Sequence, residues 1–176
     1  MMSQALAWQW PERLGERFCL IRFGMIASKA RALPQIWRYT RAIEQSARAA
    51  IDQQSGLLKS ERIMFRWNHF GFLQYWSDLD QMLAWTHNEP HTAWWKSALD
   101  RQRQSNDLVI YHETYLVNSK GFEAIYLGVD QQRPGASAFG QMVLPKGGLA
   151  TAKARLAGDQ APLLTGQAAK IKNQTN

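Results

Sequence analysis

Two ionisable side chains stand side by side in the stretch VIYHETYLV, residues 109–117. Branched and aromatic residues fill the rest of this stretch, which is typical of a β-strand. Successive side chains of a strand point to opposite faces of the sheet, so His112 and Glu113 do not form a dyad on one face. His112 can act as a general base, because the pKa of an imidazole is about 6.5. The alternative is a core histidine that is hydrogen-bonded to a backbone carbonyl or to a tyrosine.

Glu113 has a simpler explanation as a structural group. A carboxylate on an apolar sheet face needs a cation, and Arg22 in the strand-like stretch RFCLIRFGMI is a suitable partner. We expect this ion pair to tie the sheet, or two copies of the sheet, together.

An amide and several indoles form a second set of groups that could orient a substrate. Gln74 and Trp76 share one face of a predicted strand, where an amide and an indole N–H can hold the oxygen of a flat molecule. His91, Trp94 and Trp95 lie in a predicted helix and would complete an aromatic wall. The alternative is that Trp76 and one of the two helix tryptophans only fill the core.

The sequence predicts no metal site. His87 and His91 are four residues apart, but Pro90 lies between them and a helix is expected to begin near Asn88, so the two imidazoles do not share a helical face. The single cysteine excludes a disulfide framework, and no glycine-rich phosphate loop or Gly-x-Ser-x-Gly elbow occurs. Haem stays open as an alternative, since one axial histidine suffices and either His91 or His112 could supply it.

The charge and hydropathy of the chain favour a solvated protein without a nucleic-acid or membrane partner. The net charge is +7, but the basic residues are dispersed and no nucleic-acid-binding motif accompanies them. No apolar run approaches the roughly 20 residues that a membrane span needs, and the N-terminus lacks the features of a signal peptide. We therefore expect a cytoplasmic location.

Hydrophobic periodicity predicts the elements that must position these groups. The first predicted elements are a strand at 17–26, a helix at 33–55 that ends before Gly56, and two strands within 57–76 with a turn near 68–71. A short helix at 78–85, capped by Ser77 with Asp80, and a helix at 89–104, capped by Asn88, are expected to follow. The last predicted elements are strands at 107–117 and 122–129, joined by a tight turn at 118–121.

This order predicts an α+β fold, a ferredoxin-like βαββαβ sheet with helices on one face. The other face of the sheet is also apolar, and the simplest cover for it is a second copy of the sheet. We therefore expect a homodimer in the form of a dimeric α+β barrel. Residues 1–16 are expected to be a loosely held N-terminal arm, 17–130 the barrel domain, 131–158 a C-terminal extension and 159–176 a disordered tail.

Four stretches, FLQYWSDLDQMLAW, HTAWW, VIYHETYLV and FEAIYLGV, resemble a bacterial and fungal family labelled monooxygenase-like after a member in the fumagillin biosynthetic cluster. The resemblance runs from about Arg17 to about Leu156, and its most specific pieces are QYW and HETY. The family usually has Trp where this chain has Tyr111, and Asn-Met-Pro where LGVDQQRPG follows the last strand. It is placed in the dimeric α+β barrel superfamily, which includes cofactor-free monooxygenases and haem-using enzymes.

The resemblance implies a small, cofactor-independent, monooxygenase-like tailoring enzyme that acts on a lipophilic or aromatic molecule. The site would lie in an apolar hollow between the sheet and the helices, with His112 as the general base. The alternatives are a haem-binding enzyme on the same scaffold and a non-catalytic small-molecule-binding or dimerisation module. The expected catalytic residues are His112, Gln74 and Trp76, and the expected substrate-binding residues are His91, Trp94, Trp95, Tyr111, Tyr115 and Arg22.

Overall fold

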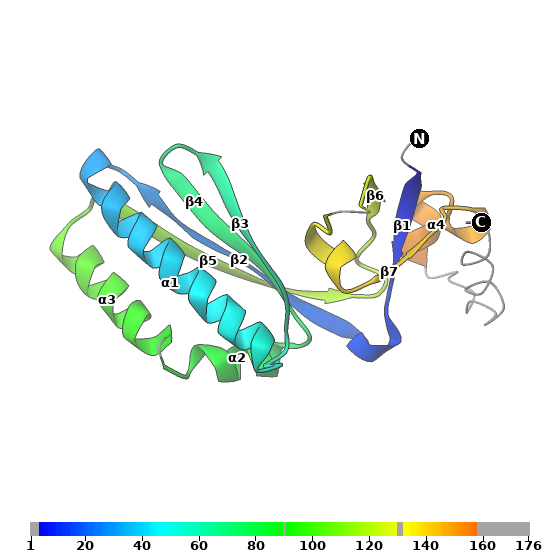
Figure 1. The fold of residues 1–176 in the computed structure, drawn as a ribbon, viewed down its shortest axis with the longest axis horizontal. Coiled ribbons are helices and arrows are strands. Elements are labelled where there is room, and N and C mark those ends of the chain that lie inside the picture. The colour runs from blue at the N-terminus through cyan, green and yellow to red at the C-terminus, as the bar shows by residue number, and fades with distance from the viewer. Residues whose placement is uncertain (1–3, 90, 130–131, 158–176) are drawn as a thin grey trace, which may run out of the picture.

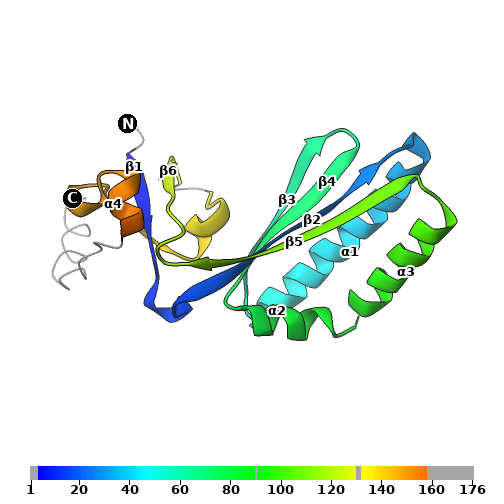
Figure 2. The ribbon, with the colours of Figure 1, turned by 180° about the vertical axis from the view of Figure 1, so that it is seen from behind.

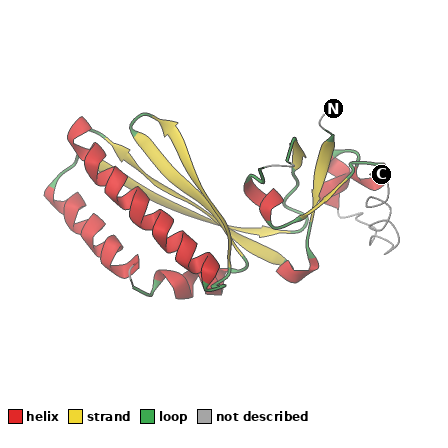
Figure 3. Ribbon diagram, viewed as in Figure 1, coloured by secondary structure: helices red, strands yellow, loops and turns green. Residues whose placement is uncertain are grey.

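The computed structural model describes residues 4–89, 91–129 and 132–157. These residues form two antiparallel sheets and four α-helices (Figures 1 and 3). The larger sheet has the strand order β3-β4-β2-β5, and the smaller sheet has the order β6-β1-β7. The strands of the larger sheet are β2 (Arg17–Ala27), β3 (Leu57–Arg66), β4 (His69–Trp76) and β5 (Leu108–Asn118).

Three helices lie on one face of the larger sheet: α1 (Leu33–Asp52), α2 (Leu79–Thr86) and α3 (His91–Gln104) (Figures 1 and 2). Pro34 stands in the first turn of α1, where its missing N–H breaks no helical hydrogen bond. All neighbouring strands of this sheet are antiparallel. The order of elements and of strands is that of a ferredoxin-like layer, so the predicted α+β fold with helices on one face is confirmed.

The core between the helices and the sheet consists of two apolar clusters. One cluster joins Ile36 of α1 to Met25 of β2 and Leu108 of β5. The other joins Ala47 of α1 to Trp76 of β4. Both clusters depend on α1, which is therefore the main cover of this face.

The third helix packs less closely than the first. Ala98 is the buried residue that α3 contributes within its described length, while Trp95 and Leu99 are exposed. The hydroxyls of Tyr39 and Ser97, 3.1 Å apart, join α1 to α3. Because apolar burial is the main force that holds a helix on a sheet, α3 is held more weakly than α1.

The start of α2 differs from the predicted cap. Asp78, rather than Ser77, is the N-cap residue, and its carboxylate accepts a hydrogen bond of 2.7 Å from the Gln81 amide. Ser77 instead donates to the side chain of Gln81. A carboxylate at this position also favours the positive end of the helix dipole, which explains the difference.

Two other boundaries shift by small amounts. The turn between β3 and β4 consists of residues 67 and 68, one residue earlier than expected. At the start of α3, the Asn88 carbonyl accepts from the His91 amide, but the side-chain acceptor is Glu89, which is hydrogen-bonded to the Ala93 amide. Glu89, not Asn88, therefore provides the side-chain cap, for the same electrostatic reason.

The predicted hairpin between 107–117 and 122–129 is wrong. The tight turn forms, with the Gly121 amide donating to the Asn118 carbonyl. However, β6 (Ile125–Leu127) pairs with β1 (Ala5–Gln9) of the smaller sheet and not with β5. The chain is drawn away because Phe122 packs edge to face against Trp8, with ring centroids 5.1 Å apart.

The N-terminal segment is not loosely held where the structure describes it. β1 is the central strand of the smaller sheet, between β6 and β7 (Gln141–Val143). Trp8 is 2% exposed, and its indole N–H donates to the Ala136 carbonyl at 2.9 Å. The extension ends in α4 (Ala152–Ala157), where the buried Arg155 pairs with Glu123 at 2.8 Å. The predicted tail at 159–176 lies outside the described residues.

The smaller sheet covers one end of the second face of the larger sheet. Phe18 and Tyr75 from that face join Trp8, Ala136 and Phe139 in one apolar cluster. The chain therefore covers part of a face that was expected to need a second copy. At the other end of this face Val109 of β5 remains 45% exposed.

Candidate active site

The strand register brings His112 into line with two phenylalanines on the helix-covered face. His112 of β5 is the partner of Phe23 of β2, which is paired in turn with Phe72 of β4. The rings of Phe23 and Phe72 are stacked with centroids 5.5 Å apart, and the His112 ring lies 6.2 Å from Phe23. The imidazole therefore lies at the end of an aromatic row.

His112 has the properties of a free base. Desolvation lowers the pKa of His112, and no hydrogen bond or charge from the described residues contributes to the shift. The imidazole is therefore neutral at pH 7, which is the state that a general base requires. The alternative of a core histidine with a hydrogen-bonded ring finds no support in the described part of the chain.

The surroundings of His112 are more open than expected. β5 is an edge strand and α3 buries little, so His112 is exposed to solvent on one side. The expectation of a hollow roofed by helices is therefore wrong at this position, where the described residues leave His112 exposed.

Gln74 and Trp76 lie on the same face as His112 but not beside it. Gln74 is in line with Thr114, and β2 separates the two strands, which at about 4.8 Å per strand step leaves their backbones about 10 Å apart. The buried Trp76 indole donates to the Gln74 side-chain oxygen at 3.3 Å, and the Gln74 amide donates to the Ser60 hydroxyl at 3.2 Å. Trp76, Gln74 and Ser60 thus donate hydrogen bonds to one another in series, within the core.

The α3 residues of the predicted site lie on two different faces of the helix. His91 and Trp95 are four residues apart and share a helical face. Burial lowers the pKa of His91, a hydrogen bond to the Thr86 backbone opposes this, and the protonated forms of His112 and His87 would lower it further. Trp94 lines a hollow of about 330 Å³ between α1, α2 and the start of α3, together with Trp85.

Arg22, Tyr111 and Tyr115 lie on the opposite face of the sheet. Arg22 forms the predicted ion pair with Glu113 at 2.8 Å, which is confirmed, and the Tyr115 hydroxyl donates to the same carboxylate at 2.8 Å. Both hydrogen bonds lower the pKa of Glu113. The Arg22 guanidinium carbon also lies 5.2 and 5.1 Å from the ring centres of Phe65 and Tyr111, within cation–π range.

Tyr111 lies flat across the sheet because two glycines leave room for it. A Cβ atom at Gly24 would come within 2.6 Å of the Tyr111 hydroxyl, and one at Gly71 within 2.8 Å. The hydroxyl is hydrogen-bonded to the His69 Nε2 atom at 3.0 Å. Burial lowers the pKa of His69 and the charges of Arg22 and Arg66 lower it further, which favours the neutral ring. The tautomer of the ring decides which of the two atoms donates.

The predicted site residues therefore fall into two groups on opposite faces. Sequence reasoning missed His69 and Phe65 of the second group, although both lie in predicted strands. The alternation within β3 and β4 assigns them to that face, but only the register between strands shows that they meet Tyr111 and Arg22. Among the described residues, no group of three or more His, Cys, Asp or Glu side chains could hold a metal ion.

A comparison with protein families matches residues 18–133 to the monooxygenase af470-like family. The chain belongs to this family. The match ends at Arg133, whereas the resemblance noted in the sequence was expected to extend to about Leu156. A comparison with curated proteins finds no match.

Two solved structures share the fold of this af470-like chain. Aldoxime dehydratase (OxdRE) in complex with butyraldoxime has a TM-score of 0.57 and 18% identity, covering 77% of this chain and 36% of its own. A second aldoxime dehydratase has a TM-score of 0.58 and 16% identity, covering 77% of this chain and 37% of its own. This chain thus spans about a third of the length of those enzymes, and at this identity the likeness shows the fold alone.

Proposed function

We propose that this protein is a small-molecule tailoring enzyme of the monooxygenase type, with His112 as its general base. The observation that carries the proposal is the unpartnered, neutral imidazole of His112 at the end of the Phe23–Phe72 row. Membership of a monooxygenase-like family supports the reaction class. The aromatic surroundings favour a flat, lipophilic substrate.

The chemistry needs no external reductant if the substrate supplies the electrons. His112 removes a proton from an activated methylene, and the resulting electron-rich anion transfers electrons to dioxygen. The methylene becomes a carbonyl, one oxygen atom stays in the product, and the other leaves as water with the two hydrogens of the methylene. A lowered pKa keeps the imidazole available for the first step at pH 7.

Residues of α3 would hold the rest of the substrate. His91 and Trp95 lie on one face of α3, and α3 is held by few buried contacts, so small movements of this helix can adapt the site to a ligand. For Gln74 and Trp76 to hold the anion, the Trp76 indole must exchange the Gln74 oxygen for a substrate oxygen. Their catalytic role remains a prediction.

Haem is the alternative occupant of the same position. The imidazoles of His112 and His91 fit the donor chemistry of an axial ligand. Bound haem would supply one-electron and oxygen chemistry, while the chain would provide the ligand and the aromatic wall. An absorbance scan of purified protein with added haemin, near roughly 400 nm, separates the two assignments.

We also propose that two copies pack through the uncovered end of the second sheet face. Val109 is exposed there, and Tyr115, which lies nearer the covered end, is exposed beside the Arg22–Glu113 ion pair. In a dimer with two-fold symmetry, the uncovered end of one copy would pack against the same end of the other copy. The smaller sheet of each copy covers the other end of the face.

Oxygen consumption with a panel of anthrone-type and other acidic methylene compounds tests the proposed function. His112→Ala is expected to reduce turnover at least about a hundredfold, the usual contribution of a general base. His87→Ala is the matched control, since His87 is an exposed histidine outside the aromatic row. Equal turnover by the His112 variant and the wild-type protein would refute the assignment.

A further inference from the structure

Figure 1 shows the tip of the β3–β4 hairpin at one end of the larger sheet. Several of the side chains at this tip are large and apolar. Met64 and Trp67 are 66% and 67% exposed, and Phe65 between them is also exposed. Trp37 of α1, 49% exposed, packs on Phe70 with ring centroids 5.3 Å apart, and Phe70 is the strand partner of Met64. Met64 and Trp37 therefore lie beside Phe70 on the helix-covered face, and with Trp67 of the adjoining turn they make the group that we call the tip patch. Phe65 lies on the opposite face, beside Arg22.

The tip patch needs an explanation because its side chains lie at the surface. Single exposed apolar residues are normal in folded proteins, but a contiguous group of them marks an interaction site. Two of its members are tryptophans, whose rings combine a large apolar body with one N–H donor. Such side chains are enriched where proteins meet the boundary between water and lipid.

The charges around the tip patch are positive. Lys29, Arg38, Arg41 and Arg66 are exposed, and the structure records no ion pair for them among the residues it describes. Nearby carboxylates are already engaged: Glu44 pairs with Arg62 at 3.1 Å and Asp107 with Arg31 at 3.0 Å. The partner of the patch must therefore bring its own negative charge.

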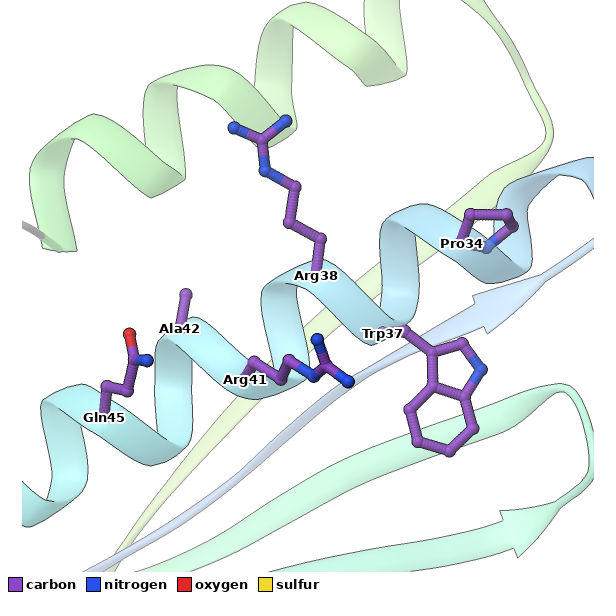
Figure 4. Close-up of a pocket in the computed structure, with 6 residues that line it drawn as sticks. All are labelled: Pro34, Trp37, Arg38, Arg41, Ala42 and Gln45. Atoms are coloured by element: carbon purple, nitrogen blue, oxygen red, sulfur yellow. The ribbon is translucent and has the colours of Figure 1, made fainter.

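A hollow beside the tip patch adds a place for a charged group. It has a volume of about 450 Å³ and lies along α1, where Trp37, Arg38 and Arg41 line it with Pro34, Ala42 and Gln45. Trp37 extends toward the hairpin and Arg38 toward α3 (Figure 4). Two guanidinium groups at one hollow match the charge of a phosphate.

We propose that the tip patch docks on the surface of an anionic phospholipid membrane. Trp37, Met64 and Trp67 would enter the interface while the arginines contact phosphate and carboxylate head groups. Nucleic acid would satisfy the arginines but leave Met64 without a role. A second copy would place the same positive charges against each other across a two-fold axis, which opposes self-association through this surface.

Surface docking requires no spanning segment, and no helix of the described part of the chain is long and apolar enough to cross a bilayer. The docking does not depend on the proposed activity. It would bring an enzyme for lipophilic molecules to the phase in which such molecules dissolve.

Sedimentation of full-length protein with lipid vesicles tests the proposal. We expect the protein to sediment with vesicles of phosphatidylcholine and phosphatidylserine and to remain in solution with phosphatidylcholine alone. Added salt should weaken the binding, because it screens exposed charges. The tryptophan emission should shift to shorter wavelength on binding.

Matched variants locate the surface. Trp67→Ala is expected to weaken vesicle partitioning about tenfold and Arg66→Gln about fivefold. Leu127→Ala and Arg48→Gln are the controls, since Leu127 is as exposed as Met64 and Arg48 is an exposed arginine farther along α1. No sedimentation with either vesicle, equal losses in the controls, or binding of RNA or duplex DNA without vesicle binding would each overturn the proposal.

Discussion

The Nε2 atom of His69 and the hydroxyl oxygen of Tyr111 lie 3.0 Å apart, although β2 runs between their strands. Tyr111 reaches across because Gly24 of β2 and Gly71 of β4 have no side chains in its path. The hydrogen bond therefore depends on the absence of side chains at these two glycines. The packing on the second face of the sheet should therefore be disturbed even by a single added methyl group at one of these glycines.

Gly24→Ala is expected to destabilise the fold by about 1–3 kcal/mol, the usual cost of overpacking. The added Cβ would lie 2.5 Å from the Phe70 carbonyl oxygen and 2.6 Å from the Tyr111 hydroxyl. Urea unfolding measures the change. Tyr111→Phe, which removes only the bond to His69, is the milder comparison at about 1 kcal/mol, and an unchanged midpoint for Gly24→Ala would contradict the described packing.

Trp8→Ala is expected to cost about 3–5 kcal/mol, the range for removing a buried large aromatic side chain. Trp8 joins β1 to the Ala136 carbonyl and to the rings of Phe122 and Phe139. Thermal unfolding followed by near-ultraviolet circular dichroism measures the loss. Trp37→Ala, at an exposed tryptophan, should cost much less; similar losses for both would mean that residues 5–9 are not part of the fold.

Val109→Asp is expected to convert the proposed dimer to a monomer. Val109 lies on the uncovered end of the second sheet face, where a carboxylate would be buried against the partner copy. Sedimentation velocity of wild-type and variant protein gives the answer. Leu127→Asp, at a more exposed residue of the smaller sheet, should leave the mass unchanged, and a monomeric wild-type protein would exclude the dimer.

Stability is expected to fall as the pH drops below about 6.5, the ordinary value for histidine. Desolvation lowers the pKa of His69, His91 and His112 in the folded chain. Below that pH the unfolded chain binds more protons, so unfolding is favoured until the folded-state pKa values are passed. Urea unfolding at several pH values should show this decrease in the free energy of unfolding with falling pH, and a smaller decrease for His112→Gln. Glu113, whose pKa is also lowered, adds its own loss only below about pH 4.5.

The larger sheet and its helices could be predicted because their signals are local. Alternation in the stretch 17–26 assigns its faces, and Pro34 and Gly56 mark the limits within which α1 forms. The smaller sheet could not, because β1 is five residues long and its Trp8 finds its partner Ala136 128 residues away. No periodicity in either segment predicts that pairing.

The candidate site was predictable to the level of the strand face and no further. The alternation of side chains along the strand predicts that His112 and Glu113 lie on opposite faces of the sheet, as observed. It does not determine the register across three strands, which brings His69 to Tyr111 and keeps Gln74 away from His112. Nor does it reveal how little α3 buries over the edge strand β5, which leaves His112 exposed.

The most direct test of the account is a nuclear magnetic resonance titration of the His112 imidazole, assigned by comparison with His112→Gln. It requires no knowledge of the substrate. We predict a midpoint below the ordinary value of about 6.5, so that the ring is mainly neutral at pH 7. A midpoint at or above that value would contradict the description of His112 as a free base.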